Sequence, residues 1–208
     1  MSITTKSELV FERFLKNNDI LFEKLAEAAT PRPDYLIYIG NIKLIFEVKE
    51  LAVDNKYGVI IDPAIPTMKS SSRTVGDYVR KRINDSTQQI KYGTNQLIPS
   101  ILLIYNNLDP VFQMFGTEDH DFIAAMYGEY TLHIDKNTMI TSDCFNGKNQ
   151  LLQDNKNTSF SAIAHLSDRI NKDGENINSI KLFENVFAKV KVPYEQLPDC
   201  FDLKRIIL

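Results

Sequence analysis

Apolar positions between residues 6 and 16 recur with the period of an α-helix. The face that they form comprises Val10, Phe11, Phe14 and Leu15. Thr5 precedes the segment and Glu8 stands three residues later, which is the spacing of a capping box. We therefore expect a helix that begins after Thr5, buries one face and ends at the polar run 17–19.

Two runs rich in β-branched and aromatic residues follow Pro33, at 35–39 and 42–49. Gly40-Asn41 separates them and is typical of a tight turn, so the two runs predict a β-hairpin. Residues 20–22 favour a short strand before it, although 22–29 also fit a second helix. Pro31 and Pro33 exclude a helix at that point and direct the chain into an extended path.

Helical spacing returns at 74–92, where Gly93 marks the expected end of the helix. Its apolar face comprises Val75, Val79, Ile83 and Ile90. The continuous apolar run 100–105 predicts a buried strand. Residues 51–73 have few periodic apolar positions, and we expect 55–72 to form a mobile loop that can close over a substrate.

The second half of the chain has weaker periodicity. It favours a helix at 118–126, strands at 130–134, 160–166 and 181–192, and a loop at 144–158. Together the elements predict an α/β fold with a mixed central sheet flanked by helices. We expect one domain over 1–208, with a core at 6–105 and additional elements at 106–208 whose role the sequence does not indicate.

Composition narrows the function classes only slightly. The 208 residues are 43% hydrophobic and 25% charged, which is ordinary for a globular protein. A net charge of −3 gives no general attraction to nucleic acid, although basic residues can still cluster locally. The sequence contains no apolar run that could span a membrane and no signal peptide at its start, so we expect a cytoplasmic protein without membrane contact.

Cysteine and histidine give no metal motif. Cys144 and Cys200 are far apart and form no CxxC pair, which argues against a zinc ribbon or a disulfide framework. The three histidines His120, His133 and His165 share no ligand spacing, and we expect them to be non-catalytic.

Charged residues interrupt the predicted hairpin at one end. Asp34 stands where the first strand begins, and Glu47 and Lys49 stand near the end of the second. Glu47 and Lys49 are two residues apart and so point to the same face of the strand. The turn at Gly40-Asn41 would make Asp34 and Glu47 cross-strand neighbours, so two carboxylates and one ammonium would converge on an otherwise apolar hairpin.

This combination suits phosphodiester hydrolysis. Adjacent carboxylates are hard oxygen ligands for Mg²⁺ or Mn²⁺. Such an ion generates a nucleophilic water and neutralises charge on the scissile phosphate, and a neighbouring lysine can orient the water or stabilise developing negative charge. Polar residues of an ordinary edge strand would be the structural explanation for the same pattern.

Pro33-Asp34 followed by Glu47-Val48-Lys49 resembles the motif of the PD-(D/E)xK nuclease superfamily. The element order over 6–105 and the Gly-Asn turn are similar to those of archaeal Holliday-junction resolvases. The resemblance implies a restriction-endonuclease-like core with C-terminal additions. It implies a metal-dependent nuclease that hydrolyses DNA, with Asp34 and Glu47 as ligands of Mg²⁺ or Mn²⁺ and Lys49 as the residue that activates water. Because this superfamily contains inactive members, the alternative is a nuclease-fold protein that binds nucleic acid or a protein partner.

The resemblance also implies helpers from the two helices. An acidic residue of the first helix often joins the metal site, and we prefer Glu8 to Glu12 because it lies nearer the buried edge, although a capping box already occupies Glu8. A glutamine of the second helix completes the site in several branches, and Gln89 matches that position, with a solvated helix flank as the competing interpretation.

Basic residues are densest around the second helix. We predict phosphate contacts for Arg73, Arg80 and Arg82, although a charged helix face is often simply solvated. The expected partner is DNA, with RNA not excluded, and a homodimer is a further option.

Overall fold

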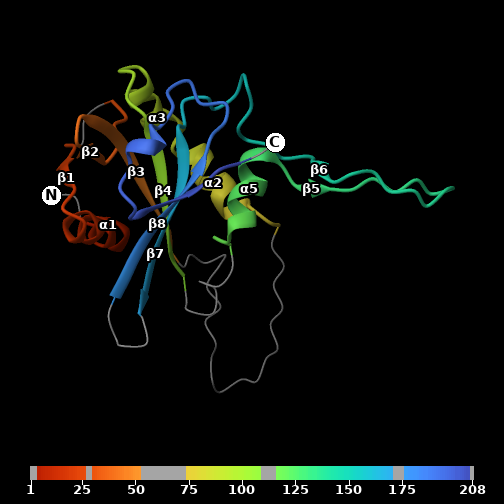
Figure 1. Cartoon of the computed structure of the whole chain (residues 1–208), viewed down its shortest axis with the longest axis horizontal. Helices are drawn as coiled ribbons and strands as arrows, with labels where there is room; N and C mark the ends of the chain where they lie inside the picture. The colour runs from red at the N-terminus through yellow and green to blue at the C-terminus, as the bar shows by residue number, and fades with distance from the viewer. Residues whose placement is uncertain (1–3, 27–29, 53–73, 109–115, 171–175, 207–208) are drawn as a thin grey trace.

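A seven-stranded sheet forms the centre of the protein, in the order β1-β2-β3-β4-β7-β8-β9 (Figure 1). The computed structural model describes residues 4–26, 30–52, 74–108, 116–170 and 176–206. The strands of this sheet are β1 Leu21–Lys24, β2 Tyr35–Ile39, β3 Ile42–Ala52, β4 Ser100–Asn107, β7 Ala162–Ile170, β8 Asn176–Glu184 and β9 Phe201–Lys204. The neighbours β3, β4 and β7 run parallel, whereas β1, β2 and β3 pair antiparallel. The mixed sheet confirms the predicted α/β class.

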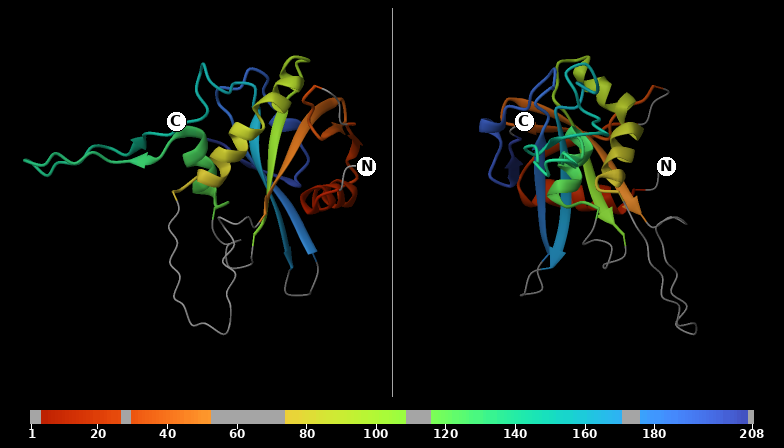
Figure 2. Two further views of the ribbon diagram at one scale, coloured as in Figure 1. Left: turned by 180° about the vertical axis from the view of Figure 1, so that it is seen from behind. Right: turned by 90° about the vertical axis from the view of Figure 1, so that its right-hand side faces the viewer.

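Helices cover both faces of this sheet. They are α1 Lys6–Asn17, α2 Asp77–Asp85, α3 Thr87–Thr94 and α5 Asp119–Tyr127. The helix α1 packs on one face, and α2, α3 and α5 pack on the other (Figure 1, Figure 2). In the described ranges, no helix has the length and apolar character needed to cross a membrane.

The first helix and the hairpin form as predicted. Thr5 and Glu8 make the capping box: Oε2 of Glu8 accepts from the Thr5 backbone N–H at 2.7 Å, and Oγ1 of Thr5 accepts from the Glu8 N–H at 3.3 Å. The strands β2 and β3 pair around Gly40, which has φ +57, and β3 continues to Ala52. Residues 21–24 form the strand β1 rather than a helix, because each of them pairs with a residue of β2.

The single helix predicted at 74–92 is wrong, because the chain divides at Ser86 into α2 and α3. Ser86 is buried, and its N–H is shared between the carbonyl groups of Arg82 and Ile83 at 3.1 and 3.4 Å. The tightened turn redirects α3 so that both short helices follow the twisted sheet. The division falls in the run Asn84-Asp85-Ser86-Thr87, whose residue types favour turns over helix interiors.

Two glycines explain the ends of this helix pair. Gly76 has φ +81 and precedes α2, and a Cβ there would lie 2.9 Å from backbone atoms of α5, so α2 begins at Asp77 rather than at residue 74. Gly93 was expected to end the helix, but α3 continues through it to Thr94. A side chain at Gly93 would clash with Ser100 and Ile45, so this glycine permits the close approach of α3 to the sheet.

The second half needs larger corrections. The helix predicted at 118–126 is confirmed as α5, and the strand at 160–166 as β7. The strand predicted at 130–134 is reduced to β5 Tyr130–Thr131, which pairs with β6 Phe145–Asn146 inside the segment expected to be a loop. The strand predicted at 181–192 ends at residue 184, where β8 ends, and β9 was not predicted. The loop predicted at 55–72 and Arg73 lie outside the described residues.

Candidate functional site

Two hydrogen bonds, to the residues on either side of Glu47, fix Asp34 at the open end of the hairpin. Its backbone N–H donates to the Phe46 carbonyl at 3.1 Å, and its Oδ2 accepts from the Val48 N–H at 2.7 Å. The register of β2 and β3 pairs Tyr35 with Phe46, so one further step places Asp34 beside Glu47. The predicted cross-strand neighbours are therefore brought together.

Glu47 and Lys49 share one face of β3, the face that α3 covers. Nζ of Lys49 lies 2.7 Å from Oε1 of Glu47. Glu47 is only 2% exposed, and its Oε2 has no hydrogen-bond partner among the described residues. A buried carboxylate oxygen without a donor is costly, so this atom marks a place where the protein leaves a binding capacity unused.

The pKa values of Asp34 and Glu47 also indicate an unmet need at this pair of carboxyl groups. Burial and then the nearby Asp34 carboxylate raise the pKa of Glu47 to about 7, against the opposing effect of Lys49. Burial also raises the pKa of Asp34, although the Val48 N–H and Lys49 act to lower it. Two carboxyl groups with a single ammonium are short of positive charge, and each would be ionised more readily beside a cation.

The residues present fit a divalent metal ion. Asp34 and Glu47 offer hard oxygen donors close enough for the Asp34 carboxylate to raise the pKa of Glu47, and Oε2 of Glu47 is buried without a partner among the described residues. Mg²⁺ is typically held by one or two carboxylates and completes its shell with water and substrate oxygens. The arrangement can thus supply the protein ligands of such an ion.

The acidic residues of α1 are engaged elsewhere. Oε1 of Glu8 lies 2.8 Å from Nζ of Lys24, and its Oε2 belongs to the capping box. Although burial acts to raise it, the pKa of Glu8 lies below its ordinary value because of Lys24 and Thr5. Glu8 is close enough to raise the pKa of Asp34, but it does not join Asp34 and Glu47 in a set of three whose ligand atoms lie within 4.8 Å.

Glu12 faces a different group. Its Oε1 accepts from the Tyr35 hydroxyl at 2.9 Å, and Lys16 lies 3.6 Å from its Oε2. Of the two candidates on α1, Glu8 is therefore the one that acts on Asp34. Lys24 was missed in the sequence, although the pairing of β1 with β2, which sets Lys24 opposite Tyr35, brings it to this end of the hairpin.

A polar stripe on α2 and α3 flanks the carboxylates. Arg82, Ser86 and Gln89 recur at helical spacing, and each has a buried polar atom that lacks a partner in the described part of the chain: Nε, Oγ and Oε1 respectively. Arg80, on the other flank of α2, bonds to α5 through the Ala124 carbonyl at 3.2 Å. On α2 the stripe therefore faces away from α5, and α3 carries its continuation onto β3.

Packing sets Gln89 at the height of Glu47. Gly93 approaches Ile45, and α3 runs opposite to β3. Gln89 lies one turn before Gly93, about 6 Å along the helix, and Glu47 lies two residues after Ile45, about 7 Å along the strand. The Arg32 guanidinium over the Tyr92 ring, 5.7 Å from its centroid, ties the start of the hairpin to the same helix.

The predicted phosphate-binding arginines have different environments. Arg80 is 9% exposed and bonded to Asp77 at 2.9 Å and to the Val75 carbonyl, so its guanidinium is occupied by structural contacts. Arg82 pairs with Asp85 at 3.3 Å on the exposed side of α2. Of the two, Arg82 keeps a position from which phosphate contact is feasible, and its role stays a prediction.

Three ligand-type side chains meet at the start of α5, at a place the sequence did not single out. In the described ranges, Glu118, His120 and Asp121 form the one set whose ligand atoms lie within 4.8 Å of one another. Asp121 is fully buried and accepts from the Gly76 N–H at 2.8 Å and from the Glu118 N–H at 3.2 Å. The Asp121 oxygens stabilise the start of α5 and the close approach of α2. This structural role accounts for the cluster without a metal ion.

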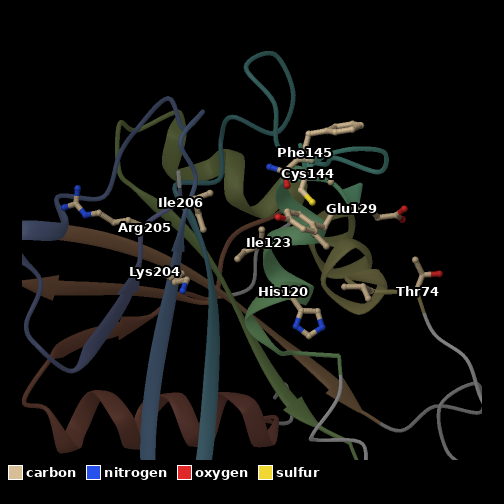
Figure 3. A pocket seen from close by; sticks show the side chains of 14 residues that line it. Thr74, His120, Ile123, Glu129, Cys144, Phe145, Lys204, Arg205 and Ile206 are labelled. Atoms are coloured by element: carbon tan, nitrogen blue, oxygen red, sulfur yellow. The ribbon is translucent and has the colours of Figure 1, made fainter. Parts of the chain in front are cut away.

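A pocket of about 950 Å³ lies beside this cluster (Figure 3). It is bounded by α5, by the strands β5 and β6, and by residues 204–206 at the end of β9. The lining includes none of the three hairpin residues Asp34, Glu47 and Lys49. Comparison with known proteins finds no matching family, no matching curated protein and no matching solved structure, so the function has to be inferred from the residues of this chain alone.

Proposed function

We propose that this protein is a metal-dependent nuclease that hydrolyses phosphodiester bonds in DNA at Asp34, Glu47 and Lys49. The observation that carries the proposal is the buried, unpartnered Oε2 of Glu47 beside Asp34, with the Lys49 ammonium 2.7 Å from the other oxygen. The short Asp and Glu-x-Lys motif supports it, as does its resemblance to the PD-(D/E)xK superfamily. A cytoplasmic location belongs to the same proposal.

Each residue has a distinct part in this chemistry. Asp34 and Glu47 would hold Mg²⁺ or Mn²⁺, which supplies a water of lowered pKa and charge neutralisation at the phosphate. Lys49 would orient a water toward phosphorus and would stabilise the negative charge that develops on the phosphoryl oxygens as the bond to the leaving sugar oxygen breaks. Gln89, at the height of Glu47, would bond a water or a phosphate oxygen, and Glu8 would assist from α1.

A second candidate is a nuclease-fold protein that binds DNA or another protein without cleaving it. The ion pair between Lys49 and Glu47 favours it, because an ammonium that stays at 2.7 Å partly neutralises the carboxylate and competes with a metal ion. The two candidates differ in whether a divalent cation binds between Asp34 and Glu47. The homodimer, which the sequence analysis left as an option, is a separate proposal that rests on other residues.

The test combines calorimetric titration with Mn²⁺ and a plasmid-nicking assay, with circular dichroism to check folding. Lys49→Ala should lower cleavage by about 10²–10³-fold and leave Mn²⁺ binding largely intact, because the lysine contacts water and phosphate. Asp34→Ala should lose both. The matched control is Lys43→Ala, an exposed lysine on the same face of β3, which should change neither.

Labelled single-stranded RNA and duplex DNA, assayed in parallel, identify the nucleic acid. If the folded wild-type protein neither binds Mn²⁺ nor cleaves any of these substrates, the nuclease proposal fails. Mn²⁺-independent DNA binding in that case would support the second candidate.

A further inference from the structure

Residues 129–147 leave the body of the protein as a long, thin hairpin, here called the arm (Figure 1). The arm begins just after α5 and contains β5 and β6 near its base. Tyr130 pairs with Asn146, Thr131 with Phe145, and an isolated bridge joins Ile134 to Thr141. Further backbone hydrogen bonds join the two sides of the arm, including one of 2.9 Å from the Ser142 N–H to the His133 carbonyl. The arm therefore extends into solvent as a hairpin held by its own backbone hydrogen bonds.

Large apolar side chains are concentrated on the arm. Among them Met139 and Ile140, at its tip, are 71% and 68% exposed. The exposed set comprises Tyr130, Leu132, Ile134, Met139, Ile140 and Phe145. Together they present several hundred Å² of apolar surface, about as much as the largest patch that a monomeric protein usually leaves in water. Since a lone two-stranded hairpin is marginally stable in water, such an arm is typical of a segment that another surface covers.

The charge of the arm argues against nucleic acid as that surface. It carries Glu129, Asp135 and Asp143 against the single basic residue Lys136. Phosphate contacts need an excess of Lys and Arg, which this segment lacks. A protein surface with apolar character and basic residues at its rim would be complementary.

This chain has such a surface at the base of the arm. The pocket in Figure 3 is lined by apolar side chains that include Val75, Ile123 and Ile206. Lys204 and Arg205 lie at the same place, where Arg205 also pairs with Glu195 at 3.0 Å and Glu129 at the base of the arm joins the lining. Because the pocket lies at one end of the arm and the exposed tip at the other, a two-fold axis across the middle of the arm brings each tip to the pocket of the other copy.

We propose that a second copy of this chain covers the arm: two arms lie antiparallel, and the Met139–Ile140 tip of each enters the pocket beside α5 of the other. Both arms and both pockets are then buried by one closed, isologous contact. With the arm and the pocket of each copy contributing, the contact approaches the roughly 800 Å² per partner of a standard interface. This inference is independent of the proposed nuclease activity, because Asp34 and Glu47 lie on another part of the sheet.

The first test is the mass of the full chain by light scattering and sedimentation at about 100 µM, where an interface of micromolar or better affinity is largely occupied. Wild-type protein should be a dimer. The double substitution M139D/I140D should give a monomer with an unchanged circular dichroism spectrum, because both side chains are exposed within one chain. Leu97→Asp, which places one such charge at a residue 80% exposed outside the arm, should leave the dimer intact.

A disulfide test reports the antiparallel order of the arms. With the axis across the middle of the arm, Ile140 of one copy lies level with Cys144 of the other. Within one chain the two positions are separated by about 13 Å of extended strand, beyond the reach of a disulfide. Ile140→Cys in a Cys200→Ser background should therefore give a covalent dimer on oxidation, and adding Cys144→Ser should abolish it.

A wild-type monomer at this concentration overturns the proposal and leaves a different protein as the occupant of the arm. A dimer that survives M139D/I140D, or a covalent dimer that forms without Cys144, also overturns it, because the arms would then not lie tip to base.

Discussion

Two clusters that contain carboxylates in this protein differ in what their oxygens do. At the start of α5, Glu118, His120 and Asp121 bring their ligand atoms within 4.8 Å of one another. At the end of the hairpin, Asp34 and Glu47 form a smaller set. The oxygens of Asp121 hold two backbone N–H groups, whereas Oε2 of Glu47 is buried without a partner among the described residues.

The difference shows that closeness of ligand atoms is a weaker indication of a metal site than an unmet electrostatic need. Asp121 meets the requirement of a helix start, where unpaired N–H groups point at the carboxylate. Glu47 has the opposite problem, because burial and Asp34 raise its pKa to about 7. A cation would relieve the second cluster and would disturb the first.

The largest expected effect separates the clusters by activity. Glu47→Gln should lower metal-dependent cleavage by about 10²–10⁴-fold, because it removes a ligand of the ion that stabilises the transition state. Asp121→Asn, a change of the same kind at the other cluster, should leave the rate within a few-fold of wild type. Plasmid nicking with Mg²⁺ measures both. Equal losses in the two variants would mean that the hairpin carboxylates are not the site of the chemistry.

The next largest effect is on stability, and here the cluster at the start of α5 should be the more sensitive of the two. Asp121→Ala should lower the free energy of unfolding by about 2–3 kcal/mol, because it leaves the N–H groups of Gly76 and Glu118 without their acceptor. Asp119→Ala, which removes a surface ion pair with Lys181, should cost less than about 1 kcal/mol. Urea denaturation without divalent cations measures both, and a stable Asp121→Ala protein would remove the structural explanation of the cluster.

Of the two clusters, only the one at the hairpin should bind a metal ion in a pH-dependent way. Glu47 must release its proton to bind a cation, and its pKa of about 7 means that about one molecule in ten is ionised there at pH 6. Mn²⁺ affinity should therefore be about tenfold weaker at pH 6 than at pH 8. Calorimetry at the two pH values measures the change, and a pH-independent affinity would mean that Glu47 is not a ligand.

The same group also makes the metal-free protein pH-sensitive. A carboxyl group whose pKa is raised on folding stabilises the fold below its unfolded pKa, and this contribution is lost as pH rises through about 7. The metal-free protein should thus lose about 1 kcal/mol from this group between pH 6 and pH 8, and Glu47→Gln should abolish that part of the slope.

The smallest effect tests whether the site extends onto α1. Glu8→Gln should lower cleavage by about tenfold or less and leave thermal stability nearly unchanged, because glutamine can replace glutamate in a capping box. Glu12→Gln, one turn away, should leave the rate unchanged because its oxygen serves Tyr35. A larger loss of activity in Glu12→Gln than in Glu8→Gln would mean that Glu12, and not Glu8, assists the site.

The elements that form from local chemistry could be predicted from the sequence. The capping box at Thr5 and Glu8, the turn at Gly40 and the apolar run of β4 each act within a few residues. The convergence of Asp34, Glu47 and Lys49 could be predicted for the same reason, since a tight hairpin determines which residues face each other across its two strands.

Tertiary packing alone decided the rest. The reach of Lys24 to Glu8 and the unpartnered oxygen of Glu47 depend on which surfaces meet, and residues far apart in the chain determine them. Residues 21–24 fit a strand or a helix by pattern. Pairing with β2 selects the strand, because β2 offers a backbone partner to each of these four residues. The strand β9 exists for a similar reason, because this short, weakly patterned segment pairs with β8.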